Sequence, residues 1–184
     1  MSDYKKPSLG VLMARVPEEP TPHSKSRNGL PDPICKPGKA WTIDRDTIGH
    51  GGSTSLIRPP VQHTDALKVA QITEFDYGDA EPEDCEEDHL ISLEIGGHPG
   101  VPANLRPEAH GGKYGSEEMD KVENWLHKQV SSGAMTPKEA QEGIRTNWKL
   151  YPLLWSAVTK SRDRLSTKWA YLLLIRDHAA LIYD

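Results

Sequence analysis

Residues 84–97, with the sequence DCEEDHLISLEIGG, decide the fold. A run of acidic residues gives way to apolar ones before paired glycines close the stretch: Leu90, Ile91, Leu93 and Ile95. This order predicts a short strand that ends in a turn. We expect residues 104–107, NLRP, to form the return strand, because Pro107 excludes a helix there.

Two amphipathic helices are predicted downstream of this hairpin. Residues 117–130 follow a capping serine, Ser116, and carry apolar side chains at helical spacing: Met119, Val122, Leu126 and Val130. The sequence TPKE at residues 136–139 has the form of a capping box with proline at the first helical position. It predicts a second helix that extends to Trp148. Trp148 and Trp125 have apolar neighbours at helical spacing, so we expect both in the core.

A third helix is predicted upstream of the hairpin, over residues 65–72. Thr64 is expected to cap its N-terminus, with Leu67 and Ala70 facing inward. Helices combined with a short hairpin predict an α+β fold with flanking helices.

Composition divides the chain into three parts. Seven of the fifteen prolines fall within residues 1–40, among polar residues, so we expect residues 1–34 to be a flexible, disordered tail. Residues 35–150 hold the predicted domain. Residues 151–184 are expected to form a helical extension, whose apolar run LLLI at 172–175 indicates a docked or partner-binding surface.

The overall composition excludes a membrane protein. The chain has 184 residues, 36% of them hydrophobic, and the longest apolar run, residues 169–175, is far shorter than a membrane span. The first residues lead into no apolar segment typical of a secretory signal. Cys35 and Cys85 are too few for a disulfide scaffold. We therefore expect a soluble, cytoplasmic protein.

Charge is distributed unevenly along the chain. The net charge is −5, and residues 74–94 hold ten acids without a lysine or arginine. The C-terminal residues 160–176 are basic, with Asp163 as their one acid: Lys160, Arg162, Arg164, Lys168 and Arg176. An acidic centre with basic flanks would suit a metal site that meets a polyanion. A solvated acidic loop is the simpler alternative.

The residues that could take part in catalysis or metal binding lie at the end of the predicted strand. Asp88 and His89 are adjacent, so their side chains point to opposite sides of the backbone. The carboxylate could hold a metal ion while the imidazole faces a water molecule. Asn104 on the return strand could bond the loop backbone and fix the histidine. Phosphodiester hydrolysis needs a base whose pKa is near neutrality and a cation that neutralises the developing charge.

The ordered series of motifs resembles the HNH (ββα-metal) endonucleases, and most closely a small bacterial and phage subgroup. The matching stretches are residues 35–38 (CKPG), 58–60 (RPP), 86–97, 104–108 (NLRPE), 120–126 (DKVENWL) and 133–141. The chain departs from the subgroup at two places. Arg106 stands where relatives often have tryptophan, and Met119 stands where they have lysine before the aspartate.

The resemblance implies a small ββα-metal core and metal-dependent hydrolysis of DNA that leaves a 5′-phosphate and a 3′-hydroxyl. It gives His89 the role of general base and Asn104 that of organiser. Asp88 becomes a metal ligand, with His110 as the expected second ligand. Asp120 and Glu123 are the alternatives for that second ligand. Mg²⁺ is the expected ion, because the ligands include carboxylates and no thiolates, and an imidazole ligand would also admit Mn²⁺, Ni²⁺ or Zn²⁺.

Two other functions remain open at this stage. The fold could serve as a non-catalytic module that binds nucleic acid or protein. The chain could also be an interaction protein that binds a partner, or a second copy of itself, through its C-terminal segment. If the substrate is DNA, the basic side chains of that segment are expected to face its backbone: Arg162, Arg164 and Lys168.

Overall fold

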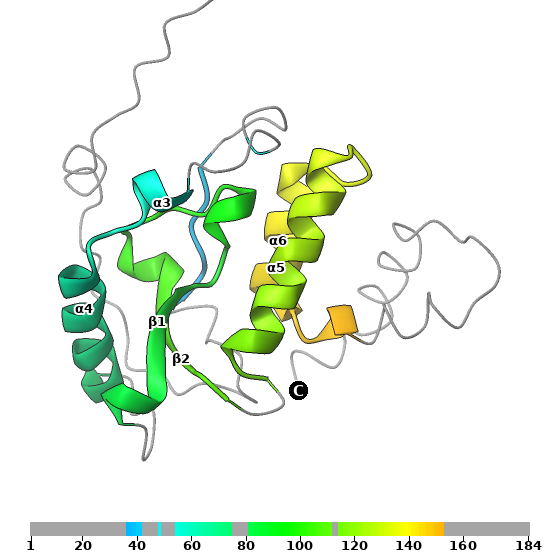
Figure 1. Cartoon of the computed structure of the whole chain (residues 1–184). Helices are drawn as coiled ribbons and strands as arrows, with labels where there is room; N and C mark the ends of the chain where they lie inside the picture. Colours follow the sequence, from blue (N-terminus) through cyan, green and yellow to red (C-terminus); the bar gives the residue numbers. More distant parts are fainter. Residues whose placement is uncertain (1–35, 42–47, 49–53, 75–80, 112–113, 153–184) are drawn as a thin grey trace, which may run out of the picture.

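The computed structural model describes residues 36–41, 48, 54–74, 81–111 and 114–152 (Figure 1). Helices and a two-stranded antiparallel sheet make up these residues, which confirms the predicted α+β class. Figure 1 shows the sheet between α4 (Val61–Glu74) on one side and α5 (Ser116–Ser131) with α6 (Pro137–Asn147) on the other. No helix in these ranges has the length and apolar character that crossing a membrane requires.

The sheet is a hairpin of β1 (Cys85–His89) and β2 (Leu105–Ala109). Their register pairs Asp88 with Arg106 and His89 with Leu105. Both predicted strands are therefore present. The apolar residues after His89 belong to a buried turn rather than to the strand, and this turn contains the short 3₁₀ helix η2 (Leu93–Ile95).

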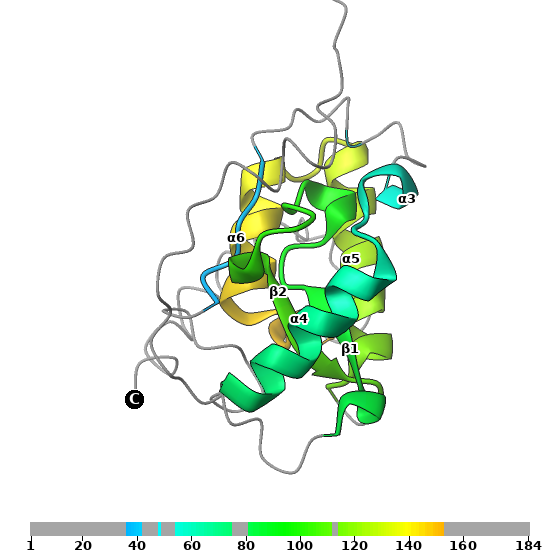
Figure 2. The ribbon, with the colours of Figure 1, turned by 90° about the vertical axis from the view of Figure 1, so that its left-hand side faces the viewer.

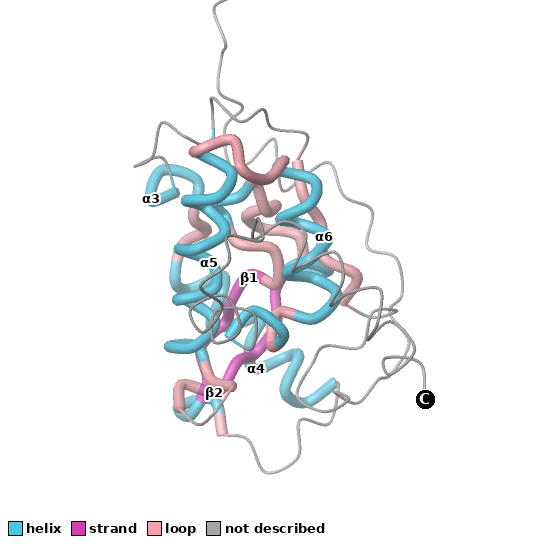
Figure 3. Tube along the Cα trace, turned by 90° about the vertical axis from the view of Figure 1, so that its right-hand side faces the viewer, coloured by secondary structure: helices cyan, strands magenta, loops and turns pink. Residues whose placement is uncertain are grey.

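The helices α5 and α6 lie side by side (Figure 3). The predicted N-terminal cap is present in α6 and differs in α5. Thr136 and Glu139 form the predicted capping box at the start of α6, with proline in the first turn. Ser116 does not cap α5. The cap position is Gly115, and Ser116 is the first helical residue.

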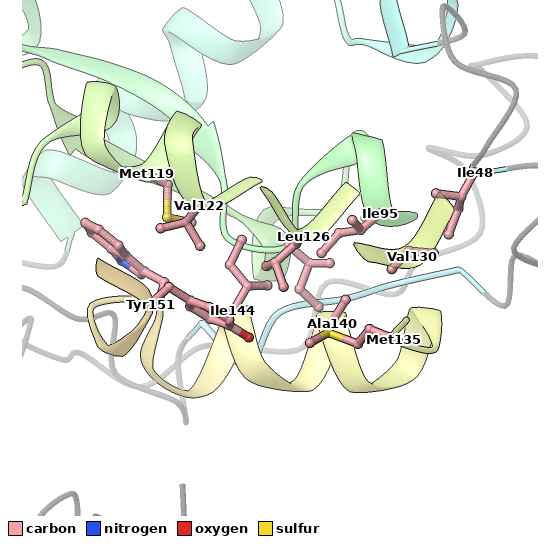
Figure 4. Packing of buried hydrophobic residues seen from close by; sticks show 12 residues of the cluster. Ile48, Ile95, Met119, Val122, Leu126, Val130, Met135, Ala140, Ile144 and Tyr151 are labelled. Atoms are coloured by element: carbon pink, nitrogen blue, oxygen red, sulfur yellow. The ribbon is translucent and has the colours of Figure 1, made fainter. Parts of the chain in front are cut away.

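One hydrophobic core joins these two helices to the turn after β1 (Figure 4). The four predicted apolar residues of α5 are fully buried in it, and burial of each such side chain contributes roughly 1.5–3 kcal/mol. Trp148 is fully buried and Trp125 packs against the cluster, so both tryptophans belong to the core as predicted. Tyr151 is also in this core, which therefore extends just past residue 150.

Helix α4 differs from its prediction at its start and in its buried residue. It begins at Val61, and Thr64 lies inside it, with its hydroxyl donating to the Val61 carbonyl (3.0 Å). Ala70 is exposed, and the one buried residue of α4 is Gln71. Gln71 Nε2 donates to Glu87 Oε1 of β1 (3.0 Å). Figure 2 shows α4 lying across this strand. The prediction rested on the spacing of apolar residues, and such spacing gives no sign of a polar contact.

An extended segment, residues 36–41, packs along the turn after β1. The Trp41 N–H donates to the Gly96 carbonyl (2.9 Å), and Ala40 forms an isolated β-bridge with Gly97. This segment is the first that the structure describes. The predicted tail (1–34) and all of the C-terminal extension except residues 151 and 152 lie outside the described residues.

Gly97 gives this turn its tight shape. Its N–H donates to the Ser92 carbonyl (2.8 Å), and a Cβ atom placed on it would lie 1.7 Å from the Ile91 carbonyl oxygen. That contact is with backbone, so rotation of a side chain could not relieve it. Gly111, by contrast, has no atom within 4 Å of the equivalent position.

We predict that Gly97→Ala lowers the free energy of unfolding by about 3 kcal/mol or more, because overpacking typically costs ~1–3 kcal/mol and here only the backbone can move. Gly111→Ala is the matched control and should leave stability within roughly 0.5 kcal/mol of the parent. Urea denaturation monitored by circular dichroism measures both. Equal stabilities of the two variants would contradict the tight packing of this turn.

Candidate functional site

The side-chain amide of Asn104 organises the region around the end of β1. Asn104 is fully buried. Its Oδ1 accepts hydrogen bonds from the N–H groups of Lys39 (3.2 Å) and Ile91 (3.0 Å). Its Nδ2 donates to the carbonyls of Ile91 (3.1 Å) and His98 (3.1 Å). The amide thus makes all four hydrogen bonds available to it and ties three chain segments together.

His89 is the last residue of β1, and its ring is held by the turn that Asn104 organises. Its side chain is almost fully buried, and Nε2 lies 2.8 Å from the Pro99 carbonyl oxygen. A carbonyl oxygen only accepts, so Nε2 carries the hydrogen and Nδ1 of the neutral ring is an acceptor. Burial is the main cause that lowers the pKa of His89. A neutral imidazole with an acceptor nitrogen is the form that a general base needs.

A group of carboxyl groups surrounds Asp88, whose neighbours come from β2 and α5. Burial and the negative charge of Asp88 raise the pKa of Glu108 to about 8, against the lowering effect of Arg106. Arg106 forms a buried ion pair with Glu108. Burial also raises the pKa of Asp120, and the charge of Asp88 adds to that effect.

Glu123 contributes the most constrained carboxyl group of the set. Its pKa is raised well above the usual range, first by burial of the carboxyl and then by the charges of Asp88, Asp120 and Glu94. The Ser92 hydroxyl donates to its Oε2 (3.0 Å). Its Oε1 is buried and has no hydrogen-bond partner within the described segments. This oxygen could accept a bond from a cation or a water molecule.

The donor chemistry of this group suits a hard divalent cation. The oxygens of Asp88, Glu108, Asp120 and Glu123 are the ligand type that Mg²⁺ prefers, and a cation among them would relieve their mutual repulsion. Across the described ranges, however, no three His, Cys, Asp or Glu side chains form a compact metal-ligand group.

The structure brings three of the residues expected from the sequence together. Asp88, His89 and Asn104 meet at one end of the hairpin, since His89 pairs with Leu105 in the register. The side chains of Asp88 and His89 lie in different surroundings. Asp88 interacts electrostatically with Glu108, Asp120 and Glu123, whereas His89 bonds to the turn.

His110 does not lie with this group, so its expected role as partner of Asp88 needs correction. It is exposed, and its N–H donates to the carbonyl of Asp84 (3.0 Å), at the opposite end of the hairpin. Asp84 precedes Asp88 by four residues, a separation of roughly 13 Å along a strand. The open alternatives for a second ligand are Asp120 and Glu123, whose pKa values are raised by burial and by the charge of Asp88.

The sequence analysis did not assign Glu108 or Arg58 to this region. Its expectation for the C-terminal basic residues is not tested by the structure. Glu108 could have been found, because residues two apart on a strand share one face, and this acid follows Arg106 on β2. Arg58 was named only as part of the RPP stretch of the resemblance, and nothing in that stretch indicated that its charge would act on His89. The expected DNA-facing residues lie outside the described residues: Arg162, Arg164 and Lys168.

No protein-family model matches this sequence, and neither a curated protein nor a solved structure shows significant similarity to it.

We predict that Asn104→Ala lowers the free energy of unfolding by about 3 kcal/mol or more, since each buried polar group left without a partner costs ~1–3 kcal/mol. Asn124→Ala is the matched control. Asn124 is exposed on α5 and makes one hydrogen bond, to the Asp120 carbonyl (2.8 Å), so its loss should change stability by less than roughly 0.5 kcal/mol. Chemical denaturation of both variants checks this, and similar losses in the two would contradict the organising role.

Proposed function

We propose that this chain is a metal-dependent endonuclease of the HNH (ββα-metal) type that hydrolyses phosphodiester bonds of DNA. One observation carries the proposal. His89 is buried and fixed as a hydrogen-bond donor to the Pro99 carbonyl, beside a carboxyl group cluster that begins at its neighbour Asp88. The chain order of β1, β2 and α5, with the hairpin antiparallel, supports a ββα-metal core.

His89 is the general base in this proposal. Its Nδ1 takes a proton from a water molecule, whose oxygen attacks phosphorus in line with the departing 3′ oxygen. The bond from Nε2–H to the Pro99 carbonyl keeps the ring oriented and stabilises the imidazolium that forms. Asn104 acts through the turn, because it holds the His98 carbonyl one residue before Pro99. Asn104 is therefore a positioning residue.

The carboxyl cluster supplies the type of oxygen donor that the metal ion of this proposal requires. The buried and unpartnered Oε1 of Glu123 and the raised pKa of its carboxyl group support a cation as the missing partner. Asp88 would hold the ion together with Asp120 or Glu123. Mg²⁺ is the first candidate, with Mn²⁺, Ni²⁺ or Zn²⁺ as further candidates. When bound, such an ion neutralises charge that develops on the phosphate and the leaving oxygen.

A non-catalytic binding module on the same fold is the second candidate. It is favoured by the lack of a compact three-ligand group among the described residues. A module of this kind would bind its partner equally well with and without a divalent ion and would leave DNA intact. Cleavage assays separate the two candidates.

We predict that purified protein nicks supercoiled plasmid DNA in the presence of at least one of Mg²⁺, Mn²⁺, Ni²⁺ and Zn²⁺, and that EDTA abolishes nicking. His89→Ala should reduce the rate by ~10²–10⁴-fold, as expected for loss of a general base. His110→Ala serves as the matched control and should cleave at the parental rate. Agarose gels measure cleavage, and circular dichroism verifies folding. A fully active His89→Ala protein would exclude the proposed base.

We further predict that Asp88→Ala weakens Mn²⁺ binding and DNA cleavage together, because it removes the central carboxylate of the cluster. Isothermal titration with Mn²⁺ measures the affinity directly. Asp120→Asn and Glu123→Gln then identify the second ligand as the one whose loss reduces affinity. If His110→Ala is the variant that loses Mn²⁺ affinity, the placement of the metal among these carboxyl groups is wrong.

A further inference from the structure

Ser92 lies in the turn after β1, and hydrogen bonds hold its backbone in place. Its side chain is buried. Its carbonyl oxygen accepts hydrogen bonds from the N–H groups of Ile95 (3.1 Å) and Gly97 (2.8 Å). The preceding residue, Ile91, is fixed by the Asn104 amide through both its N–H and its carbonyl. Ser92 therefore has little freedom to move within this turn.

The hydroxyl group of Ser92 makes two hydrogen bonds of opposite direction. It accepts the N–H of Glu94 at the start of η2 (3.2 Å). The backbone supplies the hydrogen of that bond, so the hydroxyl keeps its own hydrogen for a second acceptor. This acceptor is Oε2 of Glu123 on α5, which lies 3.0 Å from Ser92 Oγ. The hydroxyl thus connects the turn to the helix.

The backbone of Glu123 is also anchored. Glu123 lies in the middle of α5, and its helix neighbours Val122 and Leu126 are fully buried in the hydrophobic core. Ile95 of η2 belongs to the same core, so the turn and the helix are packed against each other (Figure 4). Because both of its ends are anchored, the bond from Ser92 to Glu123 fixes the orientation of the carboxyl group.

The two oxygens of the Glu123 carboxyl group differ in their partners. Oε2 accepts the hydrogen bond from Ser92. Oε1 is buried and, within the ranges that the structure describes, has no hydrogen-bond partner. A buried acceptor without a partner is unfavourable, and a divalent cation is a partner that carboxylate oxygens bind well. Asp120, the other candidate for the second metal ligand, is exposed.

We propose that Ser92 is a positioning residue of the candidate metal site, whose hydroxyl group holds Oε2 of Glu123 and keeps Oε1 available for the divalent cation. Glu123 is then the second ligand, in place of Asp120. This inference rests on the proposed function and deepens it by naming the residue that orients a ligand. Loss of a hydrogen bond that orients a metal ligand typically weakens metal binding ~10–100-fold.

The first test measures Mn²⁺ binding to the full chain by isothermal titration, with circular dichroism to verify folding. Ser92→Ala should weaken Mn²⁺ binding by ~10–100-fold, because the Glu123 carboxyl group is no longer held in one orientation. Ser92→Thr keeps the hydroxyl group and should bind Mn²⁺ more tightly than Ser92→Ala.

Thr136 provides the matched control. Its hydroxyl group makes the same pair of bonds at the start of α6, where it donates to Glu139 Oε2 (2.8 Å) and accepts the Glu139 N–H (3.2 Å). Thr136→Ala should lower stability, because the capping box is lost, and should leave the affinity for Mn²⁺ unchanged. A merely structural role of Ser92 would have the same result.

A double-variant cycle then determines whether Ser92 acts through Glu123. In the Glu123→Gln protein, Ser92→Ala should cause no further loss of Mn²⁺ affinity, because the carboxylate that it orients is absent. Glu123→Asp leaves the turn intact and withdraws the carboxyl group from Ser92 by one methylene. It should weaken Mn²⁺ binding by ~10-fold or more, and it provides the test if Ser92→Ala does not fold.

The outcomes separate this inference from the proposal on which it rests. If the parent binds Mn²⁺ and cleaves DNA while Ser92→Ala or Glu123→Asp binds Mn²⁺ at the parental affinity, Ser92 does not position the ligand and the nuclease proposal stands. An equal loss from Ser92→Ala in the parent and in the Glu123→Gln protein leads to the same conclusion. If the parent binds no divalent ion and leaves DNA intact, both proposals are overturned. A loss that Thr136→Ala does not share, and that disappears in the Glu123→Gln protein, establishes the role of Ser92.

Discussion

The four hydrogen bonds of the Asn104 amide are the constraint on which the rest of the site depends. A two-stranded hairpin alone is marginally stable in water, so β1 and β2 could not hold a catalytic group rigidly without further support. The amide supplies that support by joining the turn after β1 to residues 36–41. The Pro99 carbonyl is fixed as a result, and with it the ring of His89. The buried amide of Asn104 thus helps to fix the orientation of the proposed base through the turn.

Neighbouring positions on β1 meet opposite electrostatic environments. The imidazole of His89 is kept neutral by burial, whereas Asp88 lies among carboxyl groups whose pKa values are raised. Folding places these acids together at a cost, because burial and like charge both disfavour their ionised forms. A bound cation would recover that cost. The alternation of a β-strand is sufficient to separate the two environments, since adjacent side chains point to opposite faces.

Local patterns in the sequence predicted much of the fold, and long-range contacts limited the rest. The hairpin, the capping box at Thr136 and the apolar stripe of α5 depend on residues close in sequence, and all are present. The predicted start of α4 was wrong, since the helix begins at Val61. Its buried residue is Gln71, which bonds Glu87, whereas apolar residues were expected to face inward. His110 was chosen by its spacing from Asn104, but its place is set by the strand register. The α5 carboxyl groups reach Asp88 through tertiary packing, which spacing along the chain does not encode.

The docking of residues 36–41 also has a consequence for the order of assembly. Lys39 and the Asn104 oxygen that accepts its N–H are separated by 65 positions in the chain. Contacts of such separation form slowly, because a long loop must close before they are gained. During synthesis the segment around Lys39 is made first, and its partner does not exist until the ribosome has passed Asn104. The turn that orients His89 therefore cannot reach its final shape before residue 104 has been made, and the acidic cluster is completed later still, because Glu108, Asp120 and Glu123 follow Asn104 in the sequence.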